Sequence, residues 1–326
     1  MKVLVLGGAG YIGSHICKQL FKQGHDVVVF DNLSTGHKEA VKWGPLVEGD
    51  ILNPLECEKV LTEHGPFDLL MHFCAKSLVG ESVQHPASYY RNNVMGTMNV
   101  LDAMVKTDHD KLVFSSTAAV FGIPNVNKID ESQPRVPINP YGQSKKMVED
   151  ILQDYHQAYG LKSVCLRYFN ACGADPEAEI GERHDPETHL IPNILKSVND
   201  TSQAGLKVFG NDYPTPDGTC IRDYIHINDL ATAHMRAGDY LVQHDGAYAF
   251  NLGNGSGFSV LEVIQAAVEV VGHEIPYDIE APRAGDPAIL VANASLANSE
   301  LNWQAEYTNI KDIIATAWQW HQHETF

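Results

Sequence analysis

The chain has 326 residues and a net charge of −18, which comes from 41 acidic and 23 basic side chains. It contains no Lys- or Arg-rich run, so nucleic acid and anionic membrane surfaces are not expected as partners. A chain of this length buries a large core and forms either two domains or one large α/β unit. An anionic small molecule would therefore need a local basic pocket.

The cysteines and the first residues are typical of a cytoplasmic protein. The six cysteines show no C-x-x-C pair and no regular spacing, which favours reduced thiols over disulfides or a zinc site. The segment MKVLVLGGAG has too few apolar residues in a row for a signal peptide. No apolar run approaches the roughly 18 residues of a membrane span, so we expect no association with a membrane.

The histidines give no sign of a metal site. They number 16 and are scattered along the chain. His184 with His189, and His321 with His323, are close in sequence but lack the flanking ligands of a recognisable metal motif. The sequence therefore predicts no bound metal.

In chain order, short apolar runs alternate with segments whose apolar residues recur at helical spacing. KVLVL, DVVVF, PLVEGDI, FDLLMHF, KLVFSS and SVCLRYF predict strands, and the ranges 11–23, 54–64, 86–106 and 139–159 predict helices. Strands that are apolar on both faces indicate a parallel sheet covered by helices on each side. We expect an α/β fold with a doubly wound parallel sheet, of the Rossmann type, in a first domain at 1–170.

The second half of the chain has a different character. After residue 170 the alternation gives way to polar and Pro/Gly-rich stretches such as NACGADPEAEIGERHDPETH and GNDYPTPDGT. Long irregular loops in a compact protein are more often functional than structural. We expect a smaller C-terminal α/β domain at 171–326 that faces the substrate, with segments near 225–252 returning to the first domain.

The turn after the first strand carries glycines at positions 7, 10 and 13, in VLVLGGAGYIGSHI. Glycine permits a tight turn and lets backbone N–H groups approach a pyrophosphate at the positive end of a helix. Asp31 ends the second strand, where a carboxylate binds the hydroxyls of an adenosine ribose and repels a 2′-phosphate. The pattern predicts a dinucleotide site and favours NAD over NADP. The alternative for Asp31 is a turn formed with Asn32.

A second glycine-rich segment, NLGNGSGFS at 251–259, resembles a phosphate loop only superficially. Ser259 and Glu262 have the spacing of a capping box for the helix that follows. A structural turn is therefore favoured over a second phosphate site.

Tyr141 and Lys145, in NPYGQSKKMVED, are four residues apart near the start of a predicted helix. Asn139 is a good N-cap, so the two side chains would lie side by side on one helical face. An ammonium near a phenol lowers the pKa of the phenol and prepares it for proton exchange. The same spacing recurs at Tyr307 and Lys311 within an apolar helical pattern, where we interpret it as packing and surface.

Hydroxyl groups end the strand that precedes this helix, at Ser115, Ser116 and Thr117. In a doubly wound sheet the carboxyl ends of the strands face the ligand. A hydroxyl, a phenol and an ammonium would then meet beside a nicotinamide, which is what hydride transfer at an alcohol carbon requires.

These motifs resemble those of a known family. GGAGYIG, Asp31, GDI at 49–51, the asparagines at 92–93, SST and YGQSK together are similar to the extended short-chain dehydrogenases. HFCAKSLVGES, RYFNACGADP, THLIPNIL, VFGNDYPTPDGTCIRDYIH and APRAGDPA resemble more specifically the UDP-glucose (UDP-galactose) 4-epimerases. The resemblance runs from residue 1 to about residue 303. It implies NAD as a tightly bound cofactor, a UDP-sugar as substrate, and a homodimer formed through 86–106 and 139–159.

The resemblance also implies a mechanism. Tyr141, ionised with the help of Lys145 and the positive nicotinamide, would take the proton from the hydroxyl on sugar carbon 4 while hydride passes to NAD. Thr117 would hydrogen-bond the same oxygen. The 4-keto sugar would then rotate and recover the hydride on its opposite face, which interconverts UDP-galactose and UDP-glucose in galactose metabolism.

The family's binding residues carry over to two sets of positions. The cofactor-binding set is Gly7, Gly10, Tyr11, Ile12, Gly13, Asp31, Asn32, Asp50, Ile51, Phe73, Ala75, Asn92, Ser115, Tyr141, Lys145 and Tyr168. The substrate-binding set is Thr117, Asn170, His189, Leu190, Phe209, Arg222, Tyr224, Arg283 and Asp286. Within it, Arg222 and Arg283 suit the diphosphate, because guanidinium groups bind phosphate in a bidentate manner. The alternatives are that Phe209 belongs to the core and that Asp286 serves merely to cap a turn.

Three positions depart from the family pattern. Ser77 stands where many epimerases place a lysine, with Lys76 one position earlier, so the role of a lysine there is open. His189 stands where others have asparagine. Leu290 replaces either a bulky tyrosine or a small residue that admits N-acetylated sugars, so acceptance of UDP-GlcNAc and UDP-GalNAc is also open.

The same residues disfavour three other functions. Related dehydratases place an acid and a base directly after the threonine, whereas Ala118 and Ala119 cannot transfer protons. A one-way NADPH reductase is disfavoured by Asp31. A non-catalytic NAD-binding protein would keep the fold, but it would have no need of Tyr141 and Lys145.

Overall fold

The computed structural model describes residues 1–199, 205–283, 286–324 and 326. Its largest element is a seven-stranded sheet whose order is β11-β6-β5-β4-β1-β2-β3. Every neighbouring pair in this sheet is parallel. The strands are β1 (Lys2–Leu6), β2 (Asp26–Asp31), β3 (Leu46–Glu48), β4 (Leu69–His72), β5 (Lys111–Thr117), β6 (Lys162–Tyr168) and β11 (Ala247–Leu252). The predicted doubly wound α/β fold is therefore confirmed.

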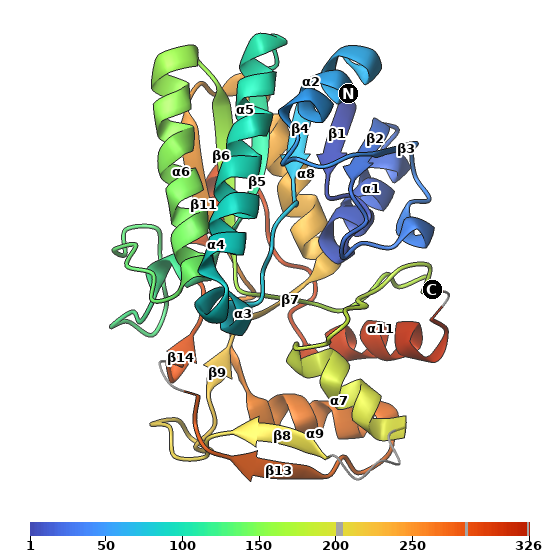
Figure 1. Ribbon diagram of the computed structural model, residues 1–326. Helices are drawn as coiled ribbons and strands as arrows, with labels where there is room; N and C mark the ends of the chain where they lie inside the picture. The colour runs from blue at the N-terminus through green and yellow to red at the C-terminus, as the bar shows by residue number, and fades with distance from the viewer. Residues whose placement is uncertain (200–204, 284–285, 325) are drawn as a thin grey trace.

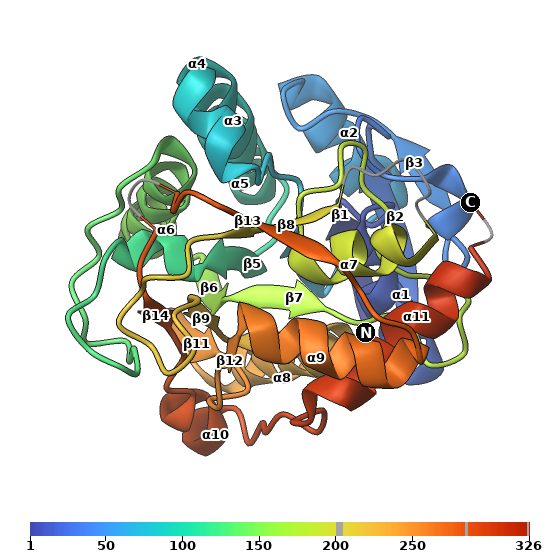
Figure 2. The same ribbon diagram turned by 90° about the horizontal axis from the view of Figure 1, so that it is seen from below.

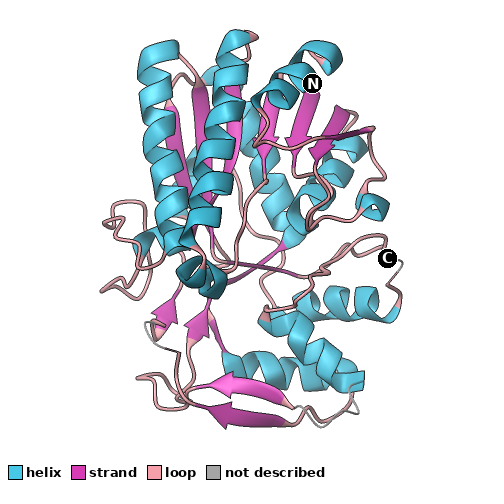
Figure 3. Ribbon diagram, in the orientation of Figure 1, coloured by secondary structure: helices cyan, strands magenta, loops and turns pink. Residues whose placement is uncertain are grey.

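Helices cover both faces of this sheet (Figures 1 and 3). Val3 and Val5 of β1 pack with α1 (Tyr11–Lys22) and α8 (Ile227–Gln243), whereas Leu4 and Leu6 face the opposite side. That second side is covered by α2 (Pro54–His64), α5 (Thr97–Lys106) and α6 (Pro140–Tyr159). Alternate residues of one strand thus enter two separate cores, which explains why the strands read as continuous apolar runs.

The helix predicted over 86–106 is composite. Beyond α3 (Val79–Gln84), it consists of α4 (Pro86–Tyr89), a π-helical stretch Tyr90–Gly96, and α5. A short i→i+5 stretch inside a longer helical segment leaves no distinct sequence signal, and such turns are frequent at functional sites. Short 3₁₀ helices also occur at Lys38–Ala40 and Ala118–Phe121.

The carboxyl ends of the main strands face a smaller C-terminal part (Figure 1). Its strands are β7 (Asn170–Cys172), β8 (Leu206–Phe209), β9 (Ile221–Arg222), β10 (Tyr224–His226), β12 (Phe258–Ser259), β13 (Tyr277–Glu280) and β14 (Ile289–Leu290). They form three small sheets, β10-β7, β12-β9-β14 and β13-β8. The helices are α7 (Leu190–Asn199), α9 (Val260–Val271), α10 (Ser295–Glu300) and α11 (Ile310–Gln322), and α9 and α11 lie side by side (Figure 2).

The chain crosses between the two parts more than once. α8 and β11 belong to the main sheet and its cover, and Trp303, which follows α10, is buried in the same core. A separate core joins α7, α9 and α11. A domain boundary at residue 170 remains a proposal. In the described part of the chain, no helix combines the length and apolar character needed to cross a bilayer.

Candidate active site

The turn between β1 and α1 has the geometry of a phosphate-binding loop. Gly7 has a φ of +83°, and a Cβ there would lie 2.8 Å from the backbone of Phe73 and Cys74. A Cβ on Gly13 would lie 2.2 Å from the carbonyl oxygen of Gly7. The turn therefore requires glycine at both positions. Gly10 caps α1 without a side chain, so the positive helix end stays open to a pyrophosphate, as NAD binding requires.

Asp31 lies directly beside this turn. Its Oδ2 accepts a hydrogen bond from the backbone N–H of Ala9 at 2.9 Å, and its Oδ1 accepts one from Leu33 at 2.8 Å. The contact with Leu33 is the local turn that the sequence offered as an alternative, so Asp31 combines this role with closing the glycine turn. Burial raises the pKa of the carboxyl, and the two backbone donors lower it. A carboxylate has about four lone-pair positions, which leaves acceptors for ribose hydroxyls.

The neighbouring strand ends bring other expected cofactor residues to the same edge. Asn32 donates to Asp50 Oδ2 at 3.1 Å, and Phe73 donates through its backbone to Leu6 at 2.7 Å. Ile51 is buried and packs against Gly96 of the π-helical stretch. These contacts place the loops after β1, β2, β3 and β4 in one continuous rim.

The first residues of α1 have different roles. The hydroxyl of Tyr11 donates to the carbonyl oxygen of Gly173 at 2.6 Å, which links the glycine turn to the segment after β7. Ile12 packs against the core of the main sheet instead.

Asn93 is a residue that the sequence prediction missed. Its side chain accepts from the backbone N–H of Lys76 at 2.9 Å, and donates to the Lys76 carbonyl at 2.9 Å and to Ser144 Oγ at 3.0 Å. It therefore joins the loop of Ala75 to α6. Asn92, the residue predicted to bind the cofactor, donates to Asn93 Oδ1 at 3.0 Å. The sequence signal was the asparagine pair itself, which does not say which member faces inward.

The helix that carries Tyr141 begins as predicted. Asn139 is the N-cap, and its side chain accepts from the backbone N–H of Gly142 at 2.8 Å. Thr117, at the end of β5, is buried close to the Tyr141 phenol. Burial raises the pKa of Tyr141, and the Thr117 hydroxyl lowers it in part. The phenol and the hydroxyl thus form the pair expected around the reacting oxygen.

Lys145 is fully buried one turn along the same helix. Its Nζ donates to the carbonyl oxygen of Ser115 at 2.6 Å and lies 4.6 Å from the centre of the Phe114 ring. Burial lowers the pKa of Lys145 to about 8. The pKa of Tyr141 is raised by burial and lowered in part by the Thr117 hydroxyl, and an effect of Lys145 on this phenol stays a prediction. Tyr168, at the end of β6, is hydrogen-bonded to Ser115 Oγ.

Glu149 supports this end of the sheet from behind, and sequence reasoning missed it. Its carboxylate accepts from Ser116 Oγ at 2.5 Å, from Arg167 at 2.7 and 2.9 Å, and from Arg135 at 2.9 Å. Glu149 is one helical turn after Lys145, and the buried ion pair fixes α6 against β5 and β6. No local sequence pattern predicts these partners, because they lie on other segments of the chain.

Residues expected at the nucleotide form two contacts in the C-terminal part. Arg222 donates to Asp286 Oδ1 at 2.5 Å, and its side chain is 12% exposed. The Arg283 guanidinium carbon lies 4.0 Å from the centre of the Phe209 ring. An arginine held by a carboxylate and another stacked on an aromatic ring can present charge and a flat surface to a nucleotide. Phe209 is partly exposed at the end of β8, so it is not simply a core residue.

Asn170 and Tyr224 are neighbours on the paired strands β7 and β10. The Asn170 side chain donates to the carbonyl oxygen of Asp223 at 2.9 Å, so its amide group holds the two strands together. Tyr224 is buried, and burial raises its pKa well above the usual range.

Comparison with known proteins gives a consistent answer. The model of the NAD dependent epimerase/dehydratase family matches residues 3–253. The chain belongs to the NAD dependent epimerase/dehydratase family. It is 50% identical to the UDP-glucose 4-epimerase of Rhizobium leguminosarum bv. trifolii, over 98% of this chain and 97% of that protein.

Solved structures of this family give the same result. The UDP-glucose 4-epimerase of Brucella ovis in complex with NAD is 48% identical, with a TM-score of 0.94 over 98% of this chain and 97% of that one. The enzyme of Bifidobacterium longum in complex with NAD⁺ and UDP is 39% identical, with a TM-score of 0.93 over 99% of both chains. The resemblance inferred from the sequence motifs is therefore confirmed.

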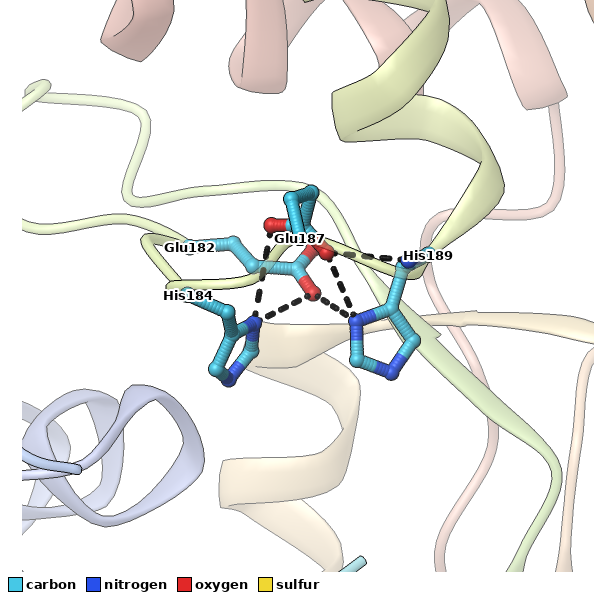
Figure 4. Close-up of side chains that lie close together, drawn as sticks. All are labelled: Glu182, His184, Glu187 and His189. Carbon is cyan, nitrogen blue, oxygen red and sulfur yellow. Dashed lines mark hydrogen bonds and ion pairs between the residues drawn. The ribbon is translucent and has the colours of Figure 1, made fainter. Parts of the chain in front are cut away.

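Two of the expected substrate residues, His189 and Leu190, lie where the loop after β7 meets α7. Leu190 is the first residue of α7. The ring of His189 points at the carboxylates of Glu182 and Glu187 (Figure 4). His189 is thus part of a cluster of four side chains that the sequence prediction did not anticipate.

Leu290 and Lys76, which the comparison with the family pattern singled out, lie in different parts of the molecule. Leu290 packs against Phe121, Val120 and Ile129, close to the segment that follows Thr117. Lys76 forms an ion pair of 3.6 Å with Glu81, and both side chains are partly exposed.

Proposed function

We propose that this chain is a UDP-glucose 4-epimerase that interconverts UDP-galactose and UDP-glucose with NAD held between turnovers. The observation that carries the proposal is the Tyr141 phenol beside the Thr117 hydroxyl, with buried Lys145 on the same helix, at the edge of the sheet that holds the glycine turn. The names of relatives that are 48 and 50% identical over nearly the full length support the same reaction.

The two parts of the molecule would bind different ligands, the cofactor and the UDP-sugar. Gly7, Gly10 and Gly13 would receive the cofactor pyrophosphate, and Asp31 its adenosine ribose. The C-terminal part would hold the UDP group through Arg222 and Arg283. The Bifidobacterium longum enzyme was solved in complex with NAD⁺ and UDP, which supports binding of both groups.

The chemistry at sugar carbon 4 would fall to Tyr141 and Thr117. Tyr141 is protonated while buried, and it acts as a base only when positive charge lies close to its phenol. When bound, NAD supplies that charge and the hydride acceptor. Thr117 would hold the carbon-4 oxygen, so that Tyr141 removes its proton and later returns it. Lys145, whose pKa is about 8, keeps its own proton near neutral pH.

The surroundings of Thr117 weigh against dehydration. Ala118 and Ala119 follow it in a short 3₁₀ helix and offer no group for proton transfer. A second candidate substrate pair, UDP-GlcNAc and UDP-GalNAc, stays open because Leu290 leaves more room beside this helix than a tyrosine would. We also propose a cytoplasmic location and a homodimer that pairs 86–106 and 139–159.

The test is conversion of sugar nucleotides by the purified protein without added cofactor. Chromatography should show UDP-glucose forming from UDP-galactose with no net NADH, and a separate incubation with UDP-GlcNAc would settle the second candidate. The control is Tyr141→Phe, which should keep its NAD and lose activity by at least about 100-fold. No conversion by the wild type, even with added NAD, would overturn the proposal.

A further inference from the structure

The loop between β7 and α7 gathers four side chains, and only His189 among them belongs to the substrate-binding set that the resemblance implies. Glu182, His184, Glu187 and His189 lie within eight residues, and one ligand atom from each lies within 4.8 Å of the others. Figure 4 shows both imidazole rings turned toward the two carboxylates. Each histidine presents its Nδ1 atom to this common centre.

The distances between these atoms can be compared with those between the ligands of one cation. His189 Nδ1 lies 2.8 Å from Glu182 Oε1 and 3.1 Å from Glu187 Oε1. His184 Nδ1 lies 3.3 Å from Glu182 Oε1 and 3.6 Å from Glu187 Oε2. Four ligands placed tetrahedrally at about 2.0–2.2 Å from zinc are separated from each other by roughly 3.3–3.6 Å. The two separations made by His184 fall in that range, whereas the two made by His189, at 2.8 and 3.1 Å, are shorter.

Burial of the two carboxylates calls for positive charge at this centre. The side chains of Glu182 and Glu187 are only 6 and 3% exposed. Buried carboxylates require a positive partner. Three of the converging atoms, Glu182 Oε1, His184 Nδ1 and Glu187 Oε2, have no hydrogen-bond partner. His189 Nδ1 forms one hydrogen bond of 3.1 Å with Glu187 Oε1, and the three atoms without a partner remain as ligands for a cation.

A neighbouring cluster provides a useful contrast. Asp175, Glu177 and Glu179 also converge, but the Nζ of Lys18 lies among them at 2.6, 2.6 and 2.5 Å and donates to all three. That cluster contains its own cation. No lysine or arginine has an ion pair with Glu182 or Glu187 in the described part of the chain.

We propose that Glu182, His184, Glu187 and His189 bind one divalent zinc ion in a closed structural site. Imidazole and carboxylate ligands together suit zinc, and four protein ligands leave no position for a substrate. Two carboxylates and two neutral imidazoles balance the charge of the ion. This proposal departs from the sequence prediction of no metal, because Glu-x-His-x-x-Glu-x-His matches none of the ligand spacings considered there.

The site would fix a junction of the fold. The ring of His184 packs edge-on against Tyr11 of the glycine turn, with ring centres 6.2 Å apart. His189 directly precedes α7. A zinc ion at this place would hold the loop after β7 against the start of α1 and define where α7 begins. The inference concerns metal content and does not depend on the proposed epimerase activity.

The experiment measures metal in the full chain, without substrate. Purified protein is exposed to one equivalent of zinc, passed through metal-free buffer and analysed by inductively coupled plasma mass spectrometry. The proposal predicts about one zinc per chain in the wild type. Glu182→Gln and Glu187→Gln should each weaken zinc binding by more than about 100-fold, since loss of even an outer-shell partner costs about 10–100-fold. Glu177→Gln, in the cluster around Lys18, is the matched control and should keep its zinc.

A second measurement protects the test against variants that fail to fold. Cobalt(II) added to the metal-free wild type should give the intense visible absorption of a tetrahedral ion, and zinc should abolish it. A wild type that retains less than a tenth of an equivalent of zinc and gives no such cobalt spectrum would overturn the proposal. So would folded Glu182→Gln and Glu187→Gln variants with unchanged zinc content. The cluster would then consist of two imidazolium–carboxylate pairs.

Discussion

Replacing Gly13 by alanine tests whether the glycine turn is as tightly packed as the structure shows. The new Cβ would lie 2.2 Å from the Gly7 carbonyl oxygen and 2.8 Å from the Gly8 Cα. Both atoms belong to the backbone, so α1 would have to move by about 1 Å to reach normal contact. Overpacking of this kind costs about 1–3 kcal/mol, and a clash with backbone belongs at the upper end. At about 2 °C per kcal/mol for a chain of this size, the Tm should fall by about 6 °C.

The displacement should also weaken cofactor binding, because the start of α1 would receive the pyrophosphate. A shift of about 1 Å in a binding site can cost about 100-fold. The assays are scanning fluorimetry of the NAD-free protein and chromatography of the NAD retained after purification. Gly10→Ala is the control for stability, because its Cβ would lie 3.4 Å from the nearest atom. A Gly13→Ala variant with the Tm and NAD content of the wild type would refute this reading of the turn.

Three further predictions follow from individual contacts. The pKa of Lys145 is about 8 in the folded chain against an ordinary value of 10.5. Between pH 8 and 10.5 the Lys145 amine is protonated mainly in the unfolded chain, so the free energy of unfolding of the NAD-free wild type should rise relative to that of Lys145→Met from pH 8 to 10. Urea titrations measure this difference. A difference that stays constant with pH would contradict the lowered pKa of Lys145. Asn93→Ala should lower the free energy of unfolding by about 2 kcal/mol, since it removes three hydrogen bonds of the Asn93 side chain, two with the Lys76 backbone and one with Ser144 of α6. Asn92→Ala should cost less than about 1 kcal/mol. Equal urea midpoints for the two asparagine variants would contradict this assignment. Leu290→Ser should raise kcat/KM for UDP-GalNAc relative to UDP-galactose by about 10-fold or more, and an unchanged ratio would show that Leu290 does not limit the pocket.

The features that the sequence predicted well depend on neighbours in the chain. The strands of the main sheet were visible because both faces are buried, so each strand is a run of apolar residues. The N-cap of α6 at Asn139 and the capping box of Ser259 and Glu262 are both present, since caps act over three residues. The pair Tyr307 and Lys311 also behaves as expected. Tyr307 stacks on His226 with ring centres 3.8 Å apart, and Lys311 pairs with Glu269 on the surface.

The features that it missed depend on contacts between distant segments. The sequence predicted a structural turn at 251–259 but not the residue that holds it: Asp223 accepts hydrogen bonds from Asn254, Gly255 and Ala292. These partners are at least 31 residues away in the chain, and no local pattern connects them. The π-helical turn at Tyr90–Gly96 was missed because a short i→i+5 stretch inside a longer helical segment leaves no distinct sequence signal. The side chains of Glu182 and Glu187 converge with two histidines only through the path of the loop, which the spacing alone does not define.

The central claim is that the chain itself retains the cofactor and returns the same hydride to the sugar. The most direct measurement uses UDP-galactose carrying deuterium at carbon 4, purified protein and no added cofactor, with mass analysis of the UDP-glucose formed. The account predicts that the product keeps all of the deuterium at carbon 4, also in the presence of unlabelled NADH. Loss of the label to solvent, or its dilution by added NADH, would contradict the account.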